Sequence, residues 1–145
     1  MKPTSPILLL LLFTVPVTVH SQSWLWSKGG GGTGKDEGYA VCTDASGNVY
    51  TVGVYSGSAT FGSVTLTSQG GEDIFIVKYD VSGNLLDAKS AGGSGADDAR
   101  GVVADASGNV FVTGRVTGNA SFGSFTLSGS GGTDLFVVKY DSKLD

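Results

Sequence analysis

Four acidic side chains come closest to chemistry in this sequence. Asp36 and Glu37 lie in one glycine-rich segment, and Asp97 and Asp98 lie in a second. A pair of carboxylates can act as acid and base in catalysis. However, the two segments are copies of one loop, and an active site is seldom repeated from copy to copy. We therefore assign no catalytic residue and expect a protein that is not an enzyme.

The same segments suggest calcium binding as an alternative. GGTGKD (31–36) and GGSGAD (92–97) match G-G-x-G-x-D, part of a calcium-binding repeat that recurs about every nine residues. Calcium needs several oxygen ligands, and Asp36 and Asp97 could supply some of them. Here, however, the motif recurs only after 61 residues. We favour a link between strands in which each aspartate accepts hydrogen bonds from loop amides, with no metal and no cofactor.

Nucleophilic residues are few. Cys42, the single cysteine, lies in the apolar run GYAVCTD (38–44), and we interpret it as a buried thiol. A reactive cysteine needs an activating neighbour such as histidine, and the single histidine, His20, lies in a segment that we expect to be removed. Trp24 and Trp26 alternate along a strand, which favours covering a sheet face, with a sugar-stacking platform as the alternative.

Residues 1–21 have the layout of a secretory signal peptide. Lys2 precedes an apolar stretch from Ile7 to Val19, and a cleavage site follows at Ser21. The stretch is shorter than the roughly 20 residues of a membrane span. We expect a secreted or cell-surface protein with no membrane insertion after cleavage, and an uncleaved anchor is the alternative. The formal net charge of −4 argues against a nucleic-acid partner.

The rest of the chain is a duplication. DASGNV occurs at 44–49 and again at 105–110, and a shift of 61 places residues 23–84 on 84–145 without a gap. Under this shift 22 of the 37 positions from 44 to 80 are identical, which indicates duplicated structural units. We divide the chain into a signal peptide (1–21), a first repeat unit (22–83) and a second, truncated unit (84–145).

One unit contains four predicted strands, at 38–44, 48–53, 73–80 and 85–91. DASGN and VSGN (81–84) are predicted turns, because glycine tolerates positive φ and Asp44 and Asn48 can bind local backbone. The third strand, DIFIVKYD, is apolar on both faces, so both faces of its sheet must be covered. Residues 61–71 are extra and form either a long loop or an added hairpin. We predict an all-β fold of tandem four-stranded antiparallel blades, about two blades of an incomplete β-propeller ring.

The combined motifs support this fold through a resemblance. The first copy reads GGTGKD, DASGNVYTVG, FGSVTL, GGEDIFIVKYD and SGNLLDAKS, and the second reads GGSGAD, DASGNVFVTG, FGSFTL and GGTDLFVVKYD. Together they resemble the bacterial β-propeller repeat called SBBP, over essentially the whole chain after residue 21. The resemblance implies secreted or surface-associated bacterial proteins with propeller domains, often inside larger multidomain chains, and it transfers no functional residue. Where that pattern favours Trp in the fourth strand, as at Trp26, the equivalent residue is Asp87.

The phase of the repeat leaves two arrangements. SWLWSKGG (23–30) aligns with a fourth strand, and the second unit ends after its third strand. In the favoured arrangement the chain is a fragment of a longer ring that its N-terminal strand would close. In the other, two-blade chains close a ring as an oligomer, because propellers need at least about four blades. We expect a non-catalytic scaffold that binds a protein or a surface glycan beside further blades.

Overall fold

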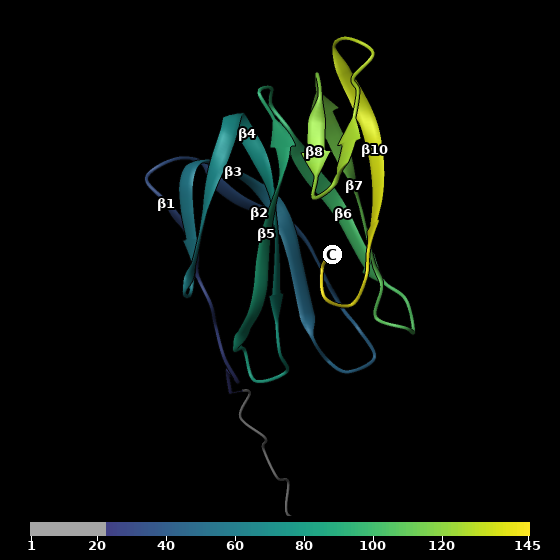
Figure 1. Cartoon of the computed structure of the whole chain (residues 1–145). Coiled ribbons are helices and arrows are strands. Elements are labelled where there is room, and N and C mark those ends of the chain that lie inside the picture. The colour runs from purple at the N-terminus through teal and green to yellow at the C-terminus, as the bar shows by residue number, and fades with distance from the viewer. Residues whose placement is uncertain (1–22) are drawn as a thin grey trace, which may run out of the picture.

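The computed structural model describes residues 23–145, and the expected signal peptide lies outside the described residues. Within 23–145 no helix has the length and apolar character needed to span a bilayer. The strands are β1 (Gly30–Gly32), β2 (Asp36–Thr43), β3 (Val49–Phe61), β4 (Val64–Tyr79), β5 (Leu85–Gly93), β6 (Asp98–Ala104), β7 (Val110–Thr117), β8 (Ala120–Phe122), β9 (Phe125–Leu127) and β10 (Thr133–Tyr140). They form two propeller-type blades that stand side by side (Figure 1), which confirms the predicted all-β fold.

The first blade is an antiparallel meander of β2, β3, β4 and β5. The β2–β3 and β4–β5 connections are the predicted turns. Asp44 Oδ1 accepts hydrogen bonds from the amides of Ser46 and Asn48, both at 2.9 Å, and Gly47 has φ +79°. Asp105 repeats the arrangement in the second blade, with Gly108 at φ +80°. The DASGN sequence is therefore explained by the turn itself. The turn needs an aspartate that accepts two backbone amides and a glycine in the left-handed conformation.

The extra segment 61–71 belongs to the strands on either side of it. β3 and β4 extend beyond the rest of the sheet as a ribbon, in which Phe61 pairs with Val64 and Ser58 pairs with Thr67. Gly62, at φ +58°, makes the turn. The short strand β1 pairs with this ribbon. In the second blade the ribbon is the separate hairpin β8–β9, and it pairs with the end of β5.

The two units are therefore linked in the same way at both positions. Gly31 pairs with Thr60, and Gly92, which is Gly31 shifted by 61, pairs with Ser121. β1 thus occupies, against the first blade, the place that the end of β5 occupies against the second. Residues 23–29, which were expected to form a fourth strand, have no strand partner in the described chain.

The second blade has three strands, in the order β10-β7-β6. The edge of β10 opposite β7 has no neighbouring strand among the described residues. The first blade fills the corresponding edge of β4 with β5.

The core lies between the blades, because each sheet is apolar on both faces. We call the face of a blade that carries Ile74 and Ile76 in β4 its trailing face, and the face that carries Phe75 and Tyr79 its leading face. The trailing face of the first blade packs on the leading face of the second and forms the junction core. Its members are fully or nearly buried: Tyr50, Val52, Ile74, Ile76, Ala91, Ala99, Val102, Val110, Val112, Val116, Ala120, Phe122, Phe136, Tyr140 and Leu144.

A second cluster covers the leading face of the first blade and contains Phe61, Phe75, Val77 and Tyr79. The rings of Phe61 and Phe75 lie 4.9 Å apart, and their repeat partners Phe122 and Phe136 lie 4.8 Å apart. The tilted aromatic pair is therefore a feature of every leading face, and it packs the hairpin ribbon against the sheet.

Candidate functional site

The glycine-rich link between the blades is held by the carboxylate of Asp97. This side chain is 1% exposed. Its Oδ2 accepts the amide of Gly93 at 2.7 Å and its Oδ1 accepts the amide of Thr117 at 2.8 Å. Asp97 therefore ties the link to the second blade, as expected for an aspartate that binds loop amides.

A second buried carboxylate, Asp73, lies beside Asp97. Asp73 is 0% exposed, its Oδ2 accepts the amide of Gln69, and its Oδ1 has no hydrogen-bond partner among the described residues. A Cβ added to Gly92 would overlap Asp73 Oδ1 and would lie 2.8 Å from Asp97 Oδ2, so both oxygens border the same glycine. Burial raises the pKa of Asp73, and the nearby Asp97 adds to this rise.

The first copy of the motif repeats only part of this arrangement. Asp36 Oδ2 accepts the amide of Gly32 at 2.8 Å, while its Oδ1 is buried without a partner among the described residues. Within residues 23–145, no group of three or more His, Cys, Asp or Glu side chains is placed to hold a metal ion. The two motif aspartates hold different links: Asp36 binds the amide of Gly32, and Asp97 binds those of Gly93 and Thr117.

Asp98 and Glu37 are held in a polar cluster that crosses the blade junction. Asp98 is 3% exposed and accepts Arg100 Nε and Arg115 Nε, both at 2.7 Å. Burial alone would raise the pKa of Asp98, but these hydrogen bonds outweigh it and hold the pKa below its usual range. The Arg100 guanidinium lies 4.6 Å from the ring centroid of Tyr39, whose hydroxyl donates to Glu37 at 2.5 Å. We call Glu37, Tyr39, Arg100 and Arg115 the junction strip.

This geometry has a clear chemical consequence. Each of the four carboxylates singled out in the sequence accepts hydrogen bonds from a loop amide, an arginine or a tyrosine. A carboxylate that two arginines keep ionised has no proton to donate, and its oxygens are not free to accept one as a base. The arrangement is suited to fixing loops and to presenting charge.

Cys42 and the two tryptophans lie in different environments. Cys42 is half-buried on the trailing face against the junction core, and burial raises the pKa of its thiol, which lowers its reactivity. Trp26 packs against Tyr79 with ring centroids 6.0 Å apart and donates from Nε1 to the carbonyl of Val81. Trp24 is 93% exposed, so only Trp26 covers a sheet face within the described chain.

The residues that form two apolar surfaces were not located from the sequence. The first is the trailing face of the second blade, where Leu135 is 78% exposed, Val137 67% and Val103 60%. Their counterparts in the first blade are Ile74, Ile76 and Cys42, and both isoleucines are 0% exposed because the second blade covers them. The repeat itself could have located this face. If a residue of the first blade must be covered by a neighbouring blade, then its counterpart 61 positions later must be covered as well.

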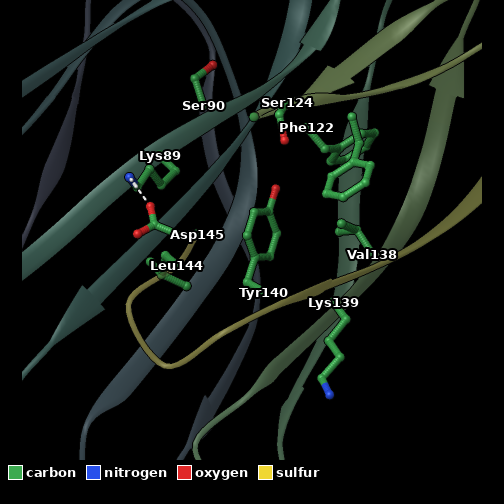
Figure 2. A pocket seen from close by; sticks show the side chains of 11 residues that line it. Lys89, Ser90, Phe122, Ser124, Val138, Lys139, Tyr140, Leu144 and Asp145 are labelled. Atoms are coloured by element: carbon green, nitrogen blue, oxygen red, sulfur yellow. Dashed lines mark hydrogen bonds and ion pairs between the residues drawn. The ribbon is translucent and has the colours of Figure 1, made fainter.

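The second surface is an open pocket of about 230 Å³ beside Tyr140. Figure 2 shows the Tyr140 ring between the Lys89–Asp145 ion pair on one side and Phe122 and Val138 on the other. Gly123 and Ser124, at the tip of the β8–β9 hairpin, also line the pocket. Burial raises the pKa of Tyr140 to about 12, so its hydroxyl stays protonated.

Comparison with known proteins supports the repeat architecture. No protein-family model matches the chain. An uncharacterized WD repeat-containing protein, L264, of Acanthamoeba polyphaga mimivirus is 30% identical over 114 residues, which cover 66% of this chain. The chain spans only 8% of the length of that relative. The likeness to a WD repeat protein agrees with the two propeller-type blades.

Proposed function

We propose that this chain is a secreted, non-catalytic propeller-repeat module of the SBBP type, which serves as an interaction scaffold on a bacterial surface. The observation that carries the proposal is the exposed trailing face of the second blade. It repeats, with Leu135 and Val137, a face that the first blade buries under its neighbour. A module with this property is built to continue into further blades. Its junction strip offers fixed charges to a protein or a surface glycan.

Secretion is tested through the N-terminus of the exported protein. The full chain is expressed in a bacterial host, and the protein recovered outside the cytoplasm is measured by intact mass. Cleavage after Ser21 supports the proposal. Cytoplasmic retention with residues 1–21 still attached contradicts it.

The scaffold role is tested by titrating labelled protein onto bacterial cells. We expect saturable binding that the double variant Tyr39→Ala/Arg100→Ala weakens, because it removes the stacked pair of the junction strip. Lys143→Ala, at an exposed position away from the strip, is the matched control. Protease treatment of the cells would abolish binding to a protein partner, and periodate treatment would abolish binding to a glycan. Absence of saturable binding to any of these cells would contradict a surface scaffold.

Calcium binding is a second candidate because Asp36 Oδ1 and Asp73 Oδ1 are buried and have no hydrogen-bond partner within residues 23–145. Carboxylate oxygens are the ligands that Ca²⁺ prefers. Calcium chloride titrated into the protein should then release or absorb heat and raise the melting temperature, and Asp36→Asn should weaken both effects. No heat and no shift in melting would remove this candidate.

A further inference from the structure

We infer that the β10 edge and the pocket beside Tyr140 are the docking site for residues 23–30 of a second copy of this chain, with Trp24 filling the pocket. The inference rests on the proposed function, because it names the partner of the exposed second blade. The two copies join head to tail, so that the leading face of one first blade covers the trailing face of the other second blade.

The first step is the correspondence between two segments. Residues 23–30 align with the start and middle of β5 under the 61-residue shift, and β1, which follows them, pairs with the β3–β4 ribbon as the end of β5 pairs with β8. The structure therefore holds the N-terminal segment where an outer strand of a preceding blade would stand. Among the described residues, no other strand of such a blade lies beside the segment.

The second step is the open edge that this segment fits. β5 pairs with β4 so that Ile76 faces Lys89 and Ile74 faces Ala91. Adding 61 to the β4 residues and subtracting 61 from the β5 residues gives the register between copies. Val137 then faces Lys28 of the second copy, and Leu135 faces its Gly30. The edge of β10 has no strand neighbour among the described residues, so its backbone groups are free to form this ladder.

The third step is the pocket. In the first blade Leu85 begins β5, packs on the leading-face cluster and lies 3.2 Å from the Cβ position of Gly62. The matching place in the second blade, beside Gly123, is the open pocket (Figure 2). The residue that aligns with Leu85 is Trp24, whose side chain is 93% exposed. The exposed indole of Trp24 and the apolar pocket of about 230 Å³ are thus the two partners of the contact that the repeat predicts between copies.

The fourth step is the wider face that docking would cover. In the existing junction Lys78 Nζ donates to the carbonyl of Ser142 at 2.6 Å, and between copies Lys139 would reach the carbonyl of Val81. Val41 on the leading face of the first blade is 66% exposed, whereas its counterpart Val102 is 8% exposed in the junction core. Each of the two faces therefore exposes residues whose counterparts the existing junction buries: Val41 on the first blade, and Leu135 and Val137 on the second. The contact is head to tail, so it propagates until a ring closes.

The test measures the mass of the full chain in solution by light scattering over a range of concentrations. We expect a discrete oligomer of about two to four chains, because rings hold about four to eight blades. Trp24→Ala should weaken association at least roughly tenfold, as loss of a buried aromatic anchor does. Leu25→Ala is the matched control: Leu25 is equally exposed (91%), and its counterpart Leu86 stays 51% exposed in the first blade. The melting curves of dilute samples should stay alike, because both side chains are exposed within one copy.

A disulfide trap checks the register. In a Cys42→Ser background, Val137→Cys protein and Lys28→Cys protein are mixed under mild oxidation, and a crosslinked pair should form because facing strand residues lie within disulfide reach. Leu25→Cys mixed with Val137→Cys is out of register and should crosslink much less. A monomer at every concentration, or equal association of the Trp24→Ala and wild-type proteins, would overturn the inference. A monomer that is still secreted and still binds cells would leave the proposed function standing, whereas an oligomer that binds no cells would contradict only that function.

Discussion

The residue with the most unusual environment is Asp73, a buried carboxylate next to Asp97. Burial raises the pKa of Asp73, so the folded protein holds a proton on it more tightly than the unfolded chain does. The corresponding stability is fully present below the pKa of the unfolded group, near 4. It is lost as the pH rises through the higher pKa of the folded state.

This sign leads to a prediction for Asp73→Asn, which cannot titrate. As the pH rises from 3 to 7, the free energy of unfolding of the wild type should fall relative to that of the variant. Chemical denaturation at each pH measures this difference. The control is Asp134→Asn, because Asp134 is the repeat counterpart of Asp73 and is only half-buried. A difference between wild type and Asp73→Asn that is independent of pH would contradict the assignment.

Gly92 is a second residue in a restrictive environment, because the junction leaves no room for a side chain at this position. Its φ is +138°, and an added Cβ would meet the carboxylates of Asp73 and Asp97. Gly118 also has a positive φ, +78°, but no heavy atom lies within 4 Å of its Cβ position. Gly118→Ala should therefore cost only backbone strain, roughly 1 kcal/mol, whereas Gly92→Ala adds overpacking and should cost about 2–4 kcal/mol. Equal losses in urea denaturation would show that Gly92 faces no steric constraint.

At the scale of elements, the turn after β10 departs from its sequence pattern. Asp141 Oδ1 accepts the amides of Lys143 and Asp145, as Asp80 Oδ1 accepts those of Ser82 and Asn84. The position that is Gly83 in the first turn is Leu144 in the second, at φ +64°. Leu144 is 1% exposed, so burial of its side chain in the junction core offsets the strained backbone.

This balance predicts an inverted order of substitutions. Leu144→Ala loses the packing and keeps the strain, at a cost of roughly 2–4 kcal/mol. Leu144→Gly loses the same packing but relieves about 1 kcal/mol of strain, so it should be the more stable of the two. Lys143, in the same turn but exposed, is the control, and there glycine should be no better than alanine. Thermal melts of the four variants decide the order, and a less stable Leu144→Gly would contradict the account.

The elements also show what the sequence could predict. DASGN could be identified because the turn is built by residues within five positions, and DIFIVKYD because apolar residues on both faces require cover on both sides. The ribbon at 61–71 was left open between a loop and a hairpin, because Val64–Thr67 pairs with an extension of β3 at Ser58–Phe61, beyond the strand end that was predicted at residue 53. Asp73 looked like a residue at the start of a strand, and only the packing of a second blade places Asp97 beside it.

The larger of the two apolar clusters of the molecule is shared by both blades. Ile76 of the first blade and Phe136 of the second belong to the same cluster, and the link between the blades is fixed by Asp97. The cluster that belongs to the first blade alone is smaller than the junction core. The two blades should therefore unfold together, in contrast to long repeat arrays, in which unfolding can proceed unit by unit.

Ile76→Ala tests this cooperativity, because Ile76 is 0% exposed and lies in the first blade only. The cavity should lower the free energy of unfolding by about 2–5 kcal/mol. If the blades unfold as one unit, hydrogen exchange of the most protected amides should accelerate by the same factor in β3 and in β10. Phe125→Ala, which removes a ring that is 74% exposed, should leave both sets nearly unchanged. Acceleration confined to β2–β5 would show that the second blade holds its structure alone, and the junction core would then be an interface between two independent units.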